Sequence, residues 1–207
     1  MKTIKSFLCV LLFLLPVVAS AQDLAPVVQN VNNAKDLSGF IQVRSELERF
    51  VVAQPRQWLV DYYLAYVDVQ LSFMVPSKEE KSLYLTEAET YLIKLSELEV
   101  PDKSEIYTLK GFRIYALIAS DPQTNGPKYS GEIITAYSTA LGINPNNPRA
   151  LILSTLFNHD MAKFMHQPYE NFEKDVSKAA ALFAEENTTL LTPTWGKSWV
   201  DFALNKK

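Results

Sequence analysis

The sequence predicts an all-α fold in which helices pair as antiparallel hairpins, and two observations support the prediction. Residues 140–150, Ala-Leu-Gly-Ile-Asn-Pro-Asn-Asn-Pro-Arg-Ala, end one segment of helical apolar periodicity and begin the next within a few residues. A second joint of the same kind lies at residues 98–107, and the spacing from Pro101 to Pro145 is 44 residues. Two joints in the same phase predict a repeated helix hairpin.

Residues 1–21 are predicted to be a signal peptide rather than part of the fold. Lys2 and Lys5 precede an apolar run over residues 7–18, and Ala19-Ser20-Ala21 is a small-residue cleavage signal. We therefore expect cleavage after Ala21 and a secreted or periplasmic protein. No later stretch has the roughly 20 apolar residues that a transmembrane helix needs.

The composition excludes several classes of function. The one cysteine, Cys9, lies inside the predicted signal peptide, so the remaining chain can form neither a disulfide nor a thiolate metal site. The net charge of −3 comes without a block of basic residues, which argues against nucleic acid as a partner. The sequence has no Gly-x-Ser-x-Gly motif and no glycine-rich phosphate loop, so no enzyme activity is predicted.

The remaining chain is predicted to consist of a polar lead-in, residues 22–35, and a single α-helical domain, residues 36–207. The lead-in is Asn-rich and is either a loose segment or a marginal first helix. The first clear helix covers residues 36–53. The next, over residues 58–75, is apolar on nearly every side, so it should be the most buried helix in the protein.

Capping residues and prolines delimit the helices that follow. Ser77 or Ser82 is the expected cap of one helix, and Ser104 is the expected cap of the next, over residues 104–120. Gly111 lies in the middle of that second helix, where it costs roughly 1 kcal/mol relative to alanine. Its presence therefore predicts a close approach of the partner helix.

The partner helix is expected over residues 129–143, after a lengthened loop that ends at Pro127. Asn144-Pro145 ends this helix, and Asn147 caps the following one with Pro148 in its first turn. The last pair is expected over residues 149–163 and 169–186. A C-terminal helix with Trp195, Trp199, Phe202 and Ala203 on one face is expected to cover the last apolar surface.

These joints and their flanking residues resemble the tetratricopeptide repeat (TPR). One unit supplies the large, small and closing residues of that repeat, in the order Tyr107, Gly111, Ile133, Tyr137, Ala140 and Pro145. Two positions depart from the pattern, because Ile133 replaces a small residue and Thr155 a glycine. The order of motifs also resembles secreted TPR-like proteins of Bacteroidetes. The resemblance implies a right-handed array of about three TPR-like antiparallel helix pairs, with an N-terminal helix and a C-terminal capping helix.

The resemblance also implies a binding surface, because the first helices of TPR pairs line a concave groove. Carried over by position, the residues expected to bind a peptide or a partner protein are Arg56, Leu59, Tyr63, Tyr66, Thr108, Phe112, Tyr115, Arg149, Leu156 and His159. An aromatic groove of this kind suits a peptide or an apolar ligand. The alternative is that these aromatic side chains fill the core between repeats.

The predicted function is a secreted, non-catalytic protein-interaction scaffold without a cofactor. The alternative is a carrier or sensor that holds a small apolar ligand between the Tyr-rich helix at residues 58–75 and its neighbours. A closed, dry cavity beside Tyr62, Tyr63 and Tyr66 would favour the carrier, and an open groove walled by those rings would favour docking. Neither the identity of the partner nor the oligomeric state follows from the sequence.

A metal enzyme is the third possibility, and no metal site is predicted. His159 and His166 are seven residues apart, with Asp160 or Glu170 as a further ligand. Against this, the segment has no His-x-x-x-His pair, and Gln167-Pro168 is expected to break the helix beside His166.

Overall fold

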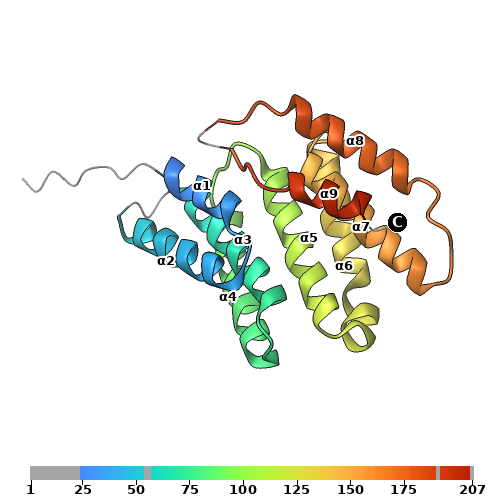
Figure 1. The fold of residues 1–207 in the computed structure, drawn as a ribbon, viewed down its shortest axis with the longest axis horizontal. Helices are drawn as coiled ribbons and strands as arrows, with labels where there is room; N and C mark the ends of the chain where they lie inside the picture. The colour runs from blue at the N-terminus through green and yellow to red at the C-terminus, as the bar shows by residue number, and fades with distance from the viewer. Residues whose placement is uncertain (1–23, 54–56, 190–191, 206–207) are drawn as a thin grey trace, which may run out of the picture.

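The computed structural model describes residues 24–53, 57–189 and 192–205, and the regular secondary structure in those ranges is helical (Figure 1). This confirms the predicted all-α fold class. The predicted signal peptide lies outside the described residues. In chain order the helices are α1 (Ala25–Asn33), α2 (Leu37–Ala53), α3 (Trp58–Met74), α4 (Lys78–Ser96), α5 (Lys103–Ser120), α6 (Pro122–Ile143), α7 (Pro148–Phe164), α8 (Phe172–Glu185) and α9 (Lys197–Leu204).

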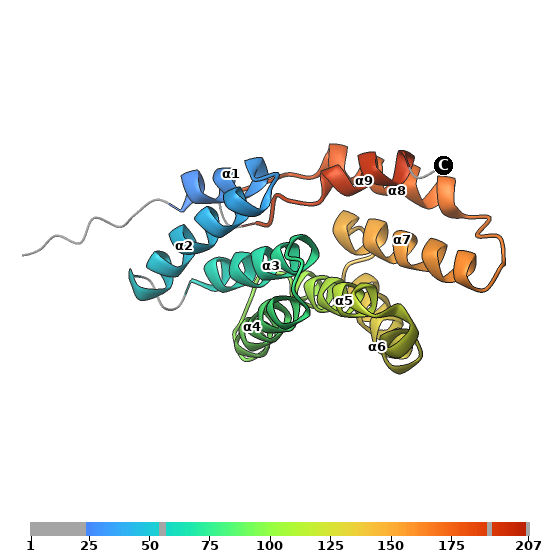
Figure 2. The same ribbon diagram turned by 60° about the horizontal axis from the view of Figure 1, so that its bottom comes forward.

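Pairs of consecutive helices form the body of the molecule, α3 with α4, α5 with α6, and α7 with α8. In Figure 2, α3, α5 and α7 lie in a central row, with α4 and α6 on one side and α1, α2, α8 and α9 on the other. The N-terminal helix α2 has a partner of its own, α1. The lead-in is therefore a helix rather than a loose segment, and it buries Val27 and Val31.

Helix α3 is the centre of the core. Every residue from Leu59 to Val69 is buried, because α2, α4 and α5 pack around this helix. The prediction that residues 58–75 form the most buried helix is confirmed. Within the described ranges, no helix is both long enough and apolar enough to cross a membrane, and this includes α3.

The predicted helix caps are confirmed at two joints between helices and wrong at one. Ser77 caps α4 by accepting from the backbone N–H of Glu80, and Asn147 caps α7 with Pro148 in the first turn. The prediction of Ser104 as the cap of α5 is wrong. The cap is Asp102, whose carboxylate accepts from the backbone N–H of Ser104 at 2.8 Å.

Helix α6 begins earlier than predicted. Asp121 caps it by accepting from the backbone N–H of Thr124 at 3.2 Å, and Pro122 occupies the first turn, where a missing N–H costs nothing. Pro127, predicted to end a loop, lies inside the helix. The extra residues of the 44-residue period therefore lengthen α6 by about two turns instead of lengthening the loop.

The close approach predicted at Gly111 is confirmed. A Cβ atom at this position would lie 2.4 Å from Cε1 of Tyr137, which is on the partner helix α6. The ring of Tyr137 therefore occupies the space that any other residue at position 111 would need, and α5 and α6 pack closely at this point.

Candidate functional site

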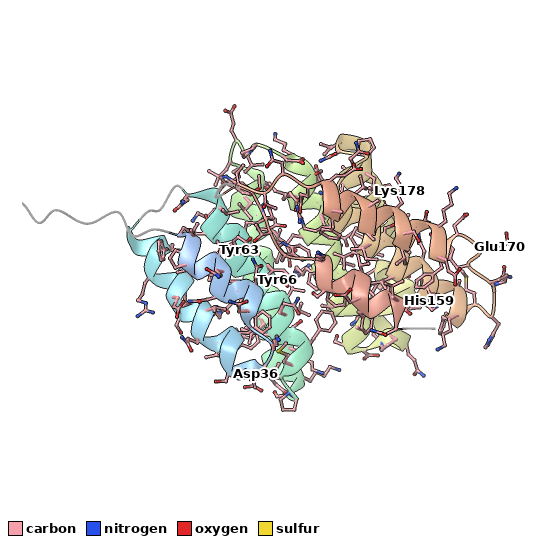
Figure 3. All side chains as sticks on the ribbon, turned by 45° about the horizontal axis from the view of Figure 1, so that its top comes forward. Asp36, Tyr63, Tyr66, His159, Glu170 and Lys178 are labelled. Atoms are coloured by element: carbon pink, nitrogen blue, oxygen red, sulfur yellow. The ribbon has the colours of Figure 1, made fainter. Side chains whose placement is uncertain are left out.

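The residues predicted to line a peptide groove do not form an open surface. The structure buries Leu59, Tyr63, Tyr66, Thr108, Phe112, Arg149 and Leu156, and it leaves Tyr115 and His159 partly exposed. Arg56 lies outside the described residues. Figure 3 shows Tyr63 and Tyr66 next to the N-terminal helices and His159 toward the α7–α8 end. Most of the set belongs to the core, and its role in binding stays a prediction.

The C-terminal segment, residues 192–205, covers the concave side of α3 and α5. Trp195 stacks on Tyr66 with ring centroids 4.4 Å apart, and on Phe112 at 5.8 Å. Trp199 meets Phe112 edge-on at 5.4 Å. Helix α9 contacts the last pair, α7 and α8, as a capping helix should. The prediction that Trp195 lies on this helix is wrong, because α9 begins at Lys197, after the turn at Gly196. The residues that precede it extend further and fill the middle of the predicted groove.

A turn at Gly196 positions the two tryptophans. Its φ of 109° is in the left-handed region, which glycine adopts without strain. An added Cβ atom would lie 2.8 Å from Cγ of Arg149 and 3.0 Å from Cζ of Phe183. Both the backbone conformation and the lack of space therefore require glycine here.

A buried network of charges and hydrogen bonds fixes the C-terminal segment to the array. Arg149 Nε donates to both carboxylate oxygens of Glu105 at 3.1 Å, and Nη1 donates to the backbone carbonyl of Trp195 at 3.0 Å. The Tyr62 hydroxyl donates to Glu105 at 2.8 Å and accepts from the Trp195 indole N–H at 2.9 Å. Glu186 pairs with Arg149 on its other side. These partners offset part of the cost of burying the charges, and burial still raises the pKa of Glu105 although Arg149 and Tyr62 oppose the shift.

Thr194 connects the C-terminal segment to the first helices. Its backbone N–H donates to the Tyr63 hydroxyl at 2.9 Å, and the two hydroxyl oxygens lie 3.0 Å apart. Asn32, at the end of α1, donates from its side chain to Thr194 Oγ1 at 2.7 Å. Residues 162 positions apart in the sequence therefore meet at this point.

A groove of about 470 Å³ remains between the α1–α2 hairpin and the C-terminal segment. We call it the Tyr66 groove. Tyr62 and Tyr63 are buried and do not line it, so it is neither the closed cavity nor the groove walled by all three rings that the sequence analysis distinguished. Tyr66, Gln70 and Met74 of α3 line its floor, Val31 and Phe40 line one wall, and Trp195, Trp199 and Phe202 line the other. Two exposed lysines, Lys35 and Lys197, also line it.

The polar groups on the floor of the Tyr66 groove are neutral. Burial raises the pKa of Tyr66 well above its ordinary value, so the hydroxyl stays protonated. This hydroxyl accepts from Gln70 Nε2 at 2.8 Å. The charges that a ligand would meet in the groove therefore come from its two lysines.

A second buried carboxylate joins α2, one wall of the groove, to α3. Arg44 Nε donates to Asp68 Oδ1 at 2.6 Å, and the same guanidinium pairs with Glu48 and Glu87. The other oxygen, Asp68 Oδ2, is buried and has no hydrogen-bond partner among the described residues. Burial raises the pKa of Asp68 to about 7, although Arg44 opposes the shift.

The two histidines considered as metal ligands have different surroundings. The ring of His159 packs against Phe172 with the centroids 4.4 Å apart and the planes tilted by 38°, and its Nδ1 atom lies 3.5 Å from Asp160 Oδ1. His166 is exposed beyond the end of α7, at a φ of 54°. Among the residues that the structure describes, no three His, Cys, Asp or Glu side chains are grouped to hold a metal ion.

Comparison with known proteins finds a solved structure of the same fold. The HusA haemophore from Porphyromonas gingivalis superposes with a TM-score of 0.75 and 22% sequence identity, over 88% of this chain and 91% of that chain. At this identity the likeness shows the fold alone. No protein-family model and no curated protein matches the sequence, so the TPR resemblance stays a resemblance.

The prediction of a scaffold that docks a peptide in an open concave groove is wrong. The solved structure that superposes on this chain is that of a haemophore, which fits the ligand-carrier alternative better than a peptide-binding scaffold. The physical reason is that the chain covers its own concave face. The TPR resemblance implied the aromatic residues on that face, but it could not show that Trp195 and Trp199 pack against them.

Proposed function

We propose that this protein carries a small, flat, largely apolar molecule of the haem or porphyrin class in the Tyr66 groove. The name of the structural neighbour, haemophore, denotes a haem carrier. The predicted signal peptide at residues 1–21 and the lack of catalytic motifs support a secreted, non-catalytic carrier. The TPR-like helix pairs would supply the rigid frame on which the groove is built.

The shape and lining of the groove support a flat apolar ligand. Its volume of about 470 Å³ is within the usual range for small-molecule sites, roughly 300–1,000 Å³. Trp195, Trp199 and Phe202 offer ring faces and edges on one wall, and Phe40 offers another on the opposite wall. Aromatic side chains bind a planar conjugated ring through stacking and through the apolar area that they bury.

The two lysines are the observation that favours the haem class in particular. Haem and related porphyrins carry carboxylate groups at one edge of an otherwise apolar ring. Lys35 and Lys197 come from opposite sides of the groove, one from the α1–α2 connection and one from the start of α9. The ammonium groups of the lysines would pair with the carboxylates of such a molecule, and the aromatic side chains would contact its apolar ring.

Titration of the chain from residue 22 with haemin, followed by tryptophan fluorescence, tests the proposal. The chain has three tryptophans, and two of them line the groove, so a bound porphyrin should quench most of the emission. We expect saturable quenching at one site. The Lys35→Glu/Lys197→Glu double variant should bind about tenfold more weakly, since two unfavourable surface charges cost on the order of 1.4 kcal/mol.

The matched control is Lys174→Glu/Lys178→Glu on α8, which makes the same change in net charge away from the groove (Figure 3 labels Lys178). Its affinity for haemin should equal that of the unmodified chain. Equal losses in the two double variants would show that the effect is general electrostatics and would remove the groove assignment. The absence of saturable quenching in the unmodified chain would remove the haem class.

A further inference from the structure

A hollow of about 250 Å³ lies between α4 and α5, and among the described residues it shares no lining residue with the Tyr66 groove. We call it the α4–α5 groove. Its apolar centre consists of the buried side chains of Leu92 and Ile106 and the exposed side chains of Ile93 and Tyr107. None of the predicted binding residues that the structure describes lines it. The groove is therefore a candidate site that the TPR resemblance did not indicate.

The α4–α5 groove is on the side of α5 that faces away from the C-terminal segment. Phe112 of α5 stacks on Trp195 of that segment. Lys110 lines the groove and is two residues before Phe112, which at about 3.6 residues per turn places it on the opposite face of the helix. Figure 2 likewise shows α4 and α9 on opposite sides of α5. A molecule in this groove therefore leaves the Tyr66 groove open.

Two lysines of α5 make the α4–α5 groove positive, although the chain as a whole has a net charge of −3. Lys103 and Lys110 are seven residues apart, so they lie about two turns, or roughly 10 Å, apart along one face. Lys103 has no ion-pair partner among the described residues. Lys110 and Glu132 are each about half exposed, with 3.8 Å between Nζ and Oε1, so their attraction is weak. Both ammonium groups are therefore available to a partner.

The third cation of the groove is neutralised within it. Arg113 forms an ion pair with Glu89, and its Nε atom donates to the backbone carbonyl of Leu85 at 2.7 Å. Arg113 and Glu89 both line the groove, and Glu89 is the one carboxylate among its described lining residues. Three cations and one carboxylate leave an excess of two positive charges beside the apolar centre.

From this arrangement we infer that the α4–α5 groove docks an acidic, amphipathic helix of a partner protein. One large apolar side chain of that helix fills the hollow, and a carboxylate meets each of Lys103 and Lys110. The volume of about 250 Å³ is below the roughly 300–1,000 Å³ usual for small-molecule sites, and a pocket that takes one anchoring side chain is typical of protein interfaces. Carboxylates seven residues apart on a helix have the same spacing as the two lysines.

A designed peptide tests the charge part of the inference. The probe is an alanine-rich helix with two glutamates seven residues apart and leucine at the third and fourth positions after the first glutamate, so that all four side chains share one face. Titrated into the nitrogen-15-labelled chain from residue 22, it should give saturable NMR shifts confined to α4 and α5. Lys103→Glu/Lys110→Glu should bind the peptide at least tenfold more weakly. Lys174→Glu/Lys178→Glu on α8, with the same change in net charge, should bind it as the unmodified chain does.

A second pair of variants tests the apolar centre. Ile93→Gln should weaken binding of the peptide at least fivefold, because the side chain that meets the leucines is lost. The matched control is Ile134→Gln, since Ile134 is also about half exposed but lies on α6 outside the groove. Glutamine favours a helix at least as well as isoleucine, so both proteins should fold.

The other occupants of such a surface give different results. Self-association of the chain that Ile93→Gln abolishes would identify a second copy as the occupant, and lysine-dependent binding to phosphatidylglycerol vesicles without binding of the peptide would identify a membrane surface. Either result would overturn the inference, and so would the absence of saturable shifts or equal affinities in the two double-lysine variants. Haemin binding should be unchanged in Lys103→Glu/Lys110→Glu, so a failure here is separate from a failure of the haem proposal.

Discussion

Each wall of the Tyr66 groove is attached to the helical array by an arginine–carboxylate ion pair, but the two carboxylates differ in how many of their oxygens are hydrogen-bonded. On the C-terminal side, Arg149 and Glu105 are buried and bonded to Tyr62 and to Trp195. On the N-terminal side, Arg44 binds only one oxygen of the buried Asp68 and shares its guanidinium with two exposed or partly exposed glutamates. Both carboxylate oxygens of Glu105 have hydrogen-bond partners, whereas one oxygen of Asp68 has none among the described residues.

The two ion pairs therefore make different contributions to the structure of the groove. The network makes the position of Trp195 specific, because a displacement of Trp195 breaks the bond that its carbonyl accepts from Arg149 and the bond that its indole N–H donates to Tyr62. The attachment of α2 depends instead on the protonation of one carboxylate. Burial raises the pKa of both carboxyl groups, Glu105 and Asp68. Because Asp68 also has one oxygen without a hydrogen-bond partner among the described residues, we expect the attachment of the N-terminal wall to change as the pH passes through about 7.

The largest effect should follow from Arg149→Met. The substitution keeps an apolar chain of similar length but leaves Glu105 buried without its cation, which should cost about 3–5 kcal/mol of unfolding free energy. Urea denaturation followed by circular dichroism measures the loss. Lys110→Met is the control, because Lys110 and its partner Glu132 are both about half exposed and the loss should be no more than about 1 kcal/mol. Similar losses in both variants would contradict the contrast.

The second effect concerns pH and Asp68. Its folded pKa, about 7, is above the ordinary value of 3.8, so the folded state binds the proton more tightly than the unfolded state. The contribution of Asp68 to stability should therefore be greatest below about pH 4, decrease as the pH rises through 7, and stay constant above that. A decrease of about 2–4 kcal/mol is expected, because each tenfold difference in proton affinity between the two states corresponds to about 1.4 kcal/mol.

Asp68→Asn isolates this contribution, because asparagine does not titrate. The difference in unfolding free energy between the unmodified chain and Asp68→Asn should decrease between about pH 4 and about pH 7, as measured by urea denaturation at several pH values. Parallel stability curves for the two proteins would show that Asp68 titrates normally. They would also remove the distinction between the two walls.

The smallest effect should come from Thr194→Val, which weakens the point where the two walls meet. Valine has the same shape but cannot accept from Asn32 or bond to the Tyr63 hydroxyl. The backbone bond from residue 194 to Tyr63 remains, so the loss should be about 1 kcal/mol. A loss as large as that of Arg149→Met would place the main attachment of the segment here rather than at Glu105.

Local signals in the sequence predicted most of the helices. Asn147-Pro148 marks the start of α7 because the side chain caps the helix and proline needs no N–H there, and Gly111 indicated a close helix contact. The start of α6 is earlier than predicted, because two signals in the sequence conflict. Asp121-Pro122 is a cap followed by a first-turn proline, but Gly126-Pro127 within the next turn favoured a loop.

The candidate site could not be predicted to the same extent, because it depends on contacts between distant residues. Nothing local in the segment around Trp195 indicates that it packs on Tyr66 rather than on α8. One signal was available in the spacing of Glu105 and Arg149, which is one repeat period. Equivalent positions in consecutive repeats are close in space, so opposite charges at these two positions indicate a pair between repeats.

The contact between Thr194 and Asn32 has a consequence for how the protein unfolds. An open stack of helix hairpins has nearest-neighbour contacts only, so its ends can fray while the middle stays folded. Here Thr194, in the C-terminal segment, is bonded to Asn32 of the first helix and to Tyr63 of α3, so the two ends of the stack are linked to each other. Loss of either terminus should therefore release both, and we expect a single all-or-none transition with slow formation, since the closing contacts are among the longest-range in the chain.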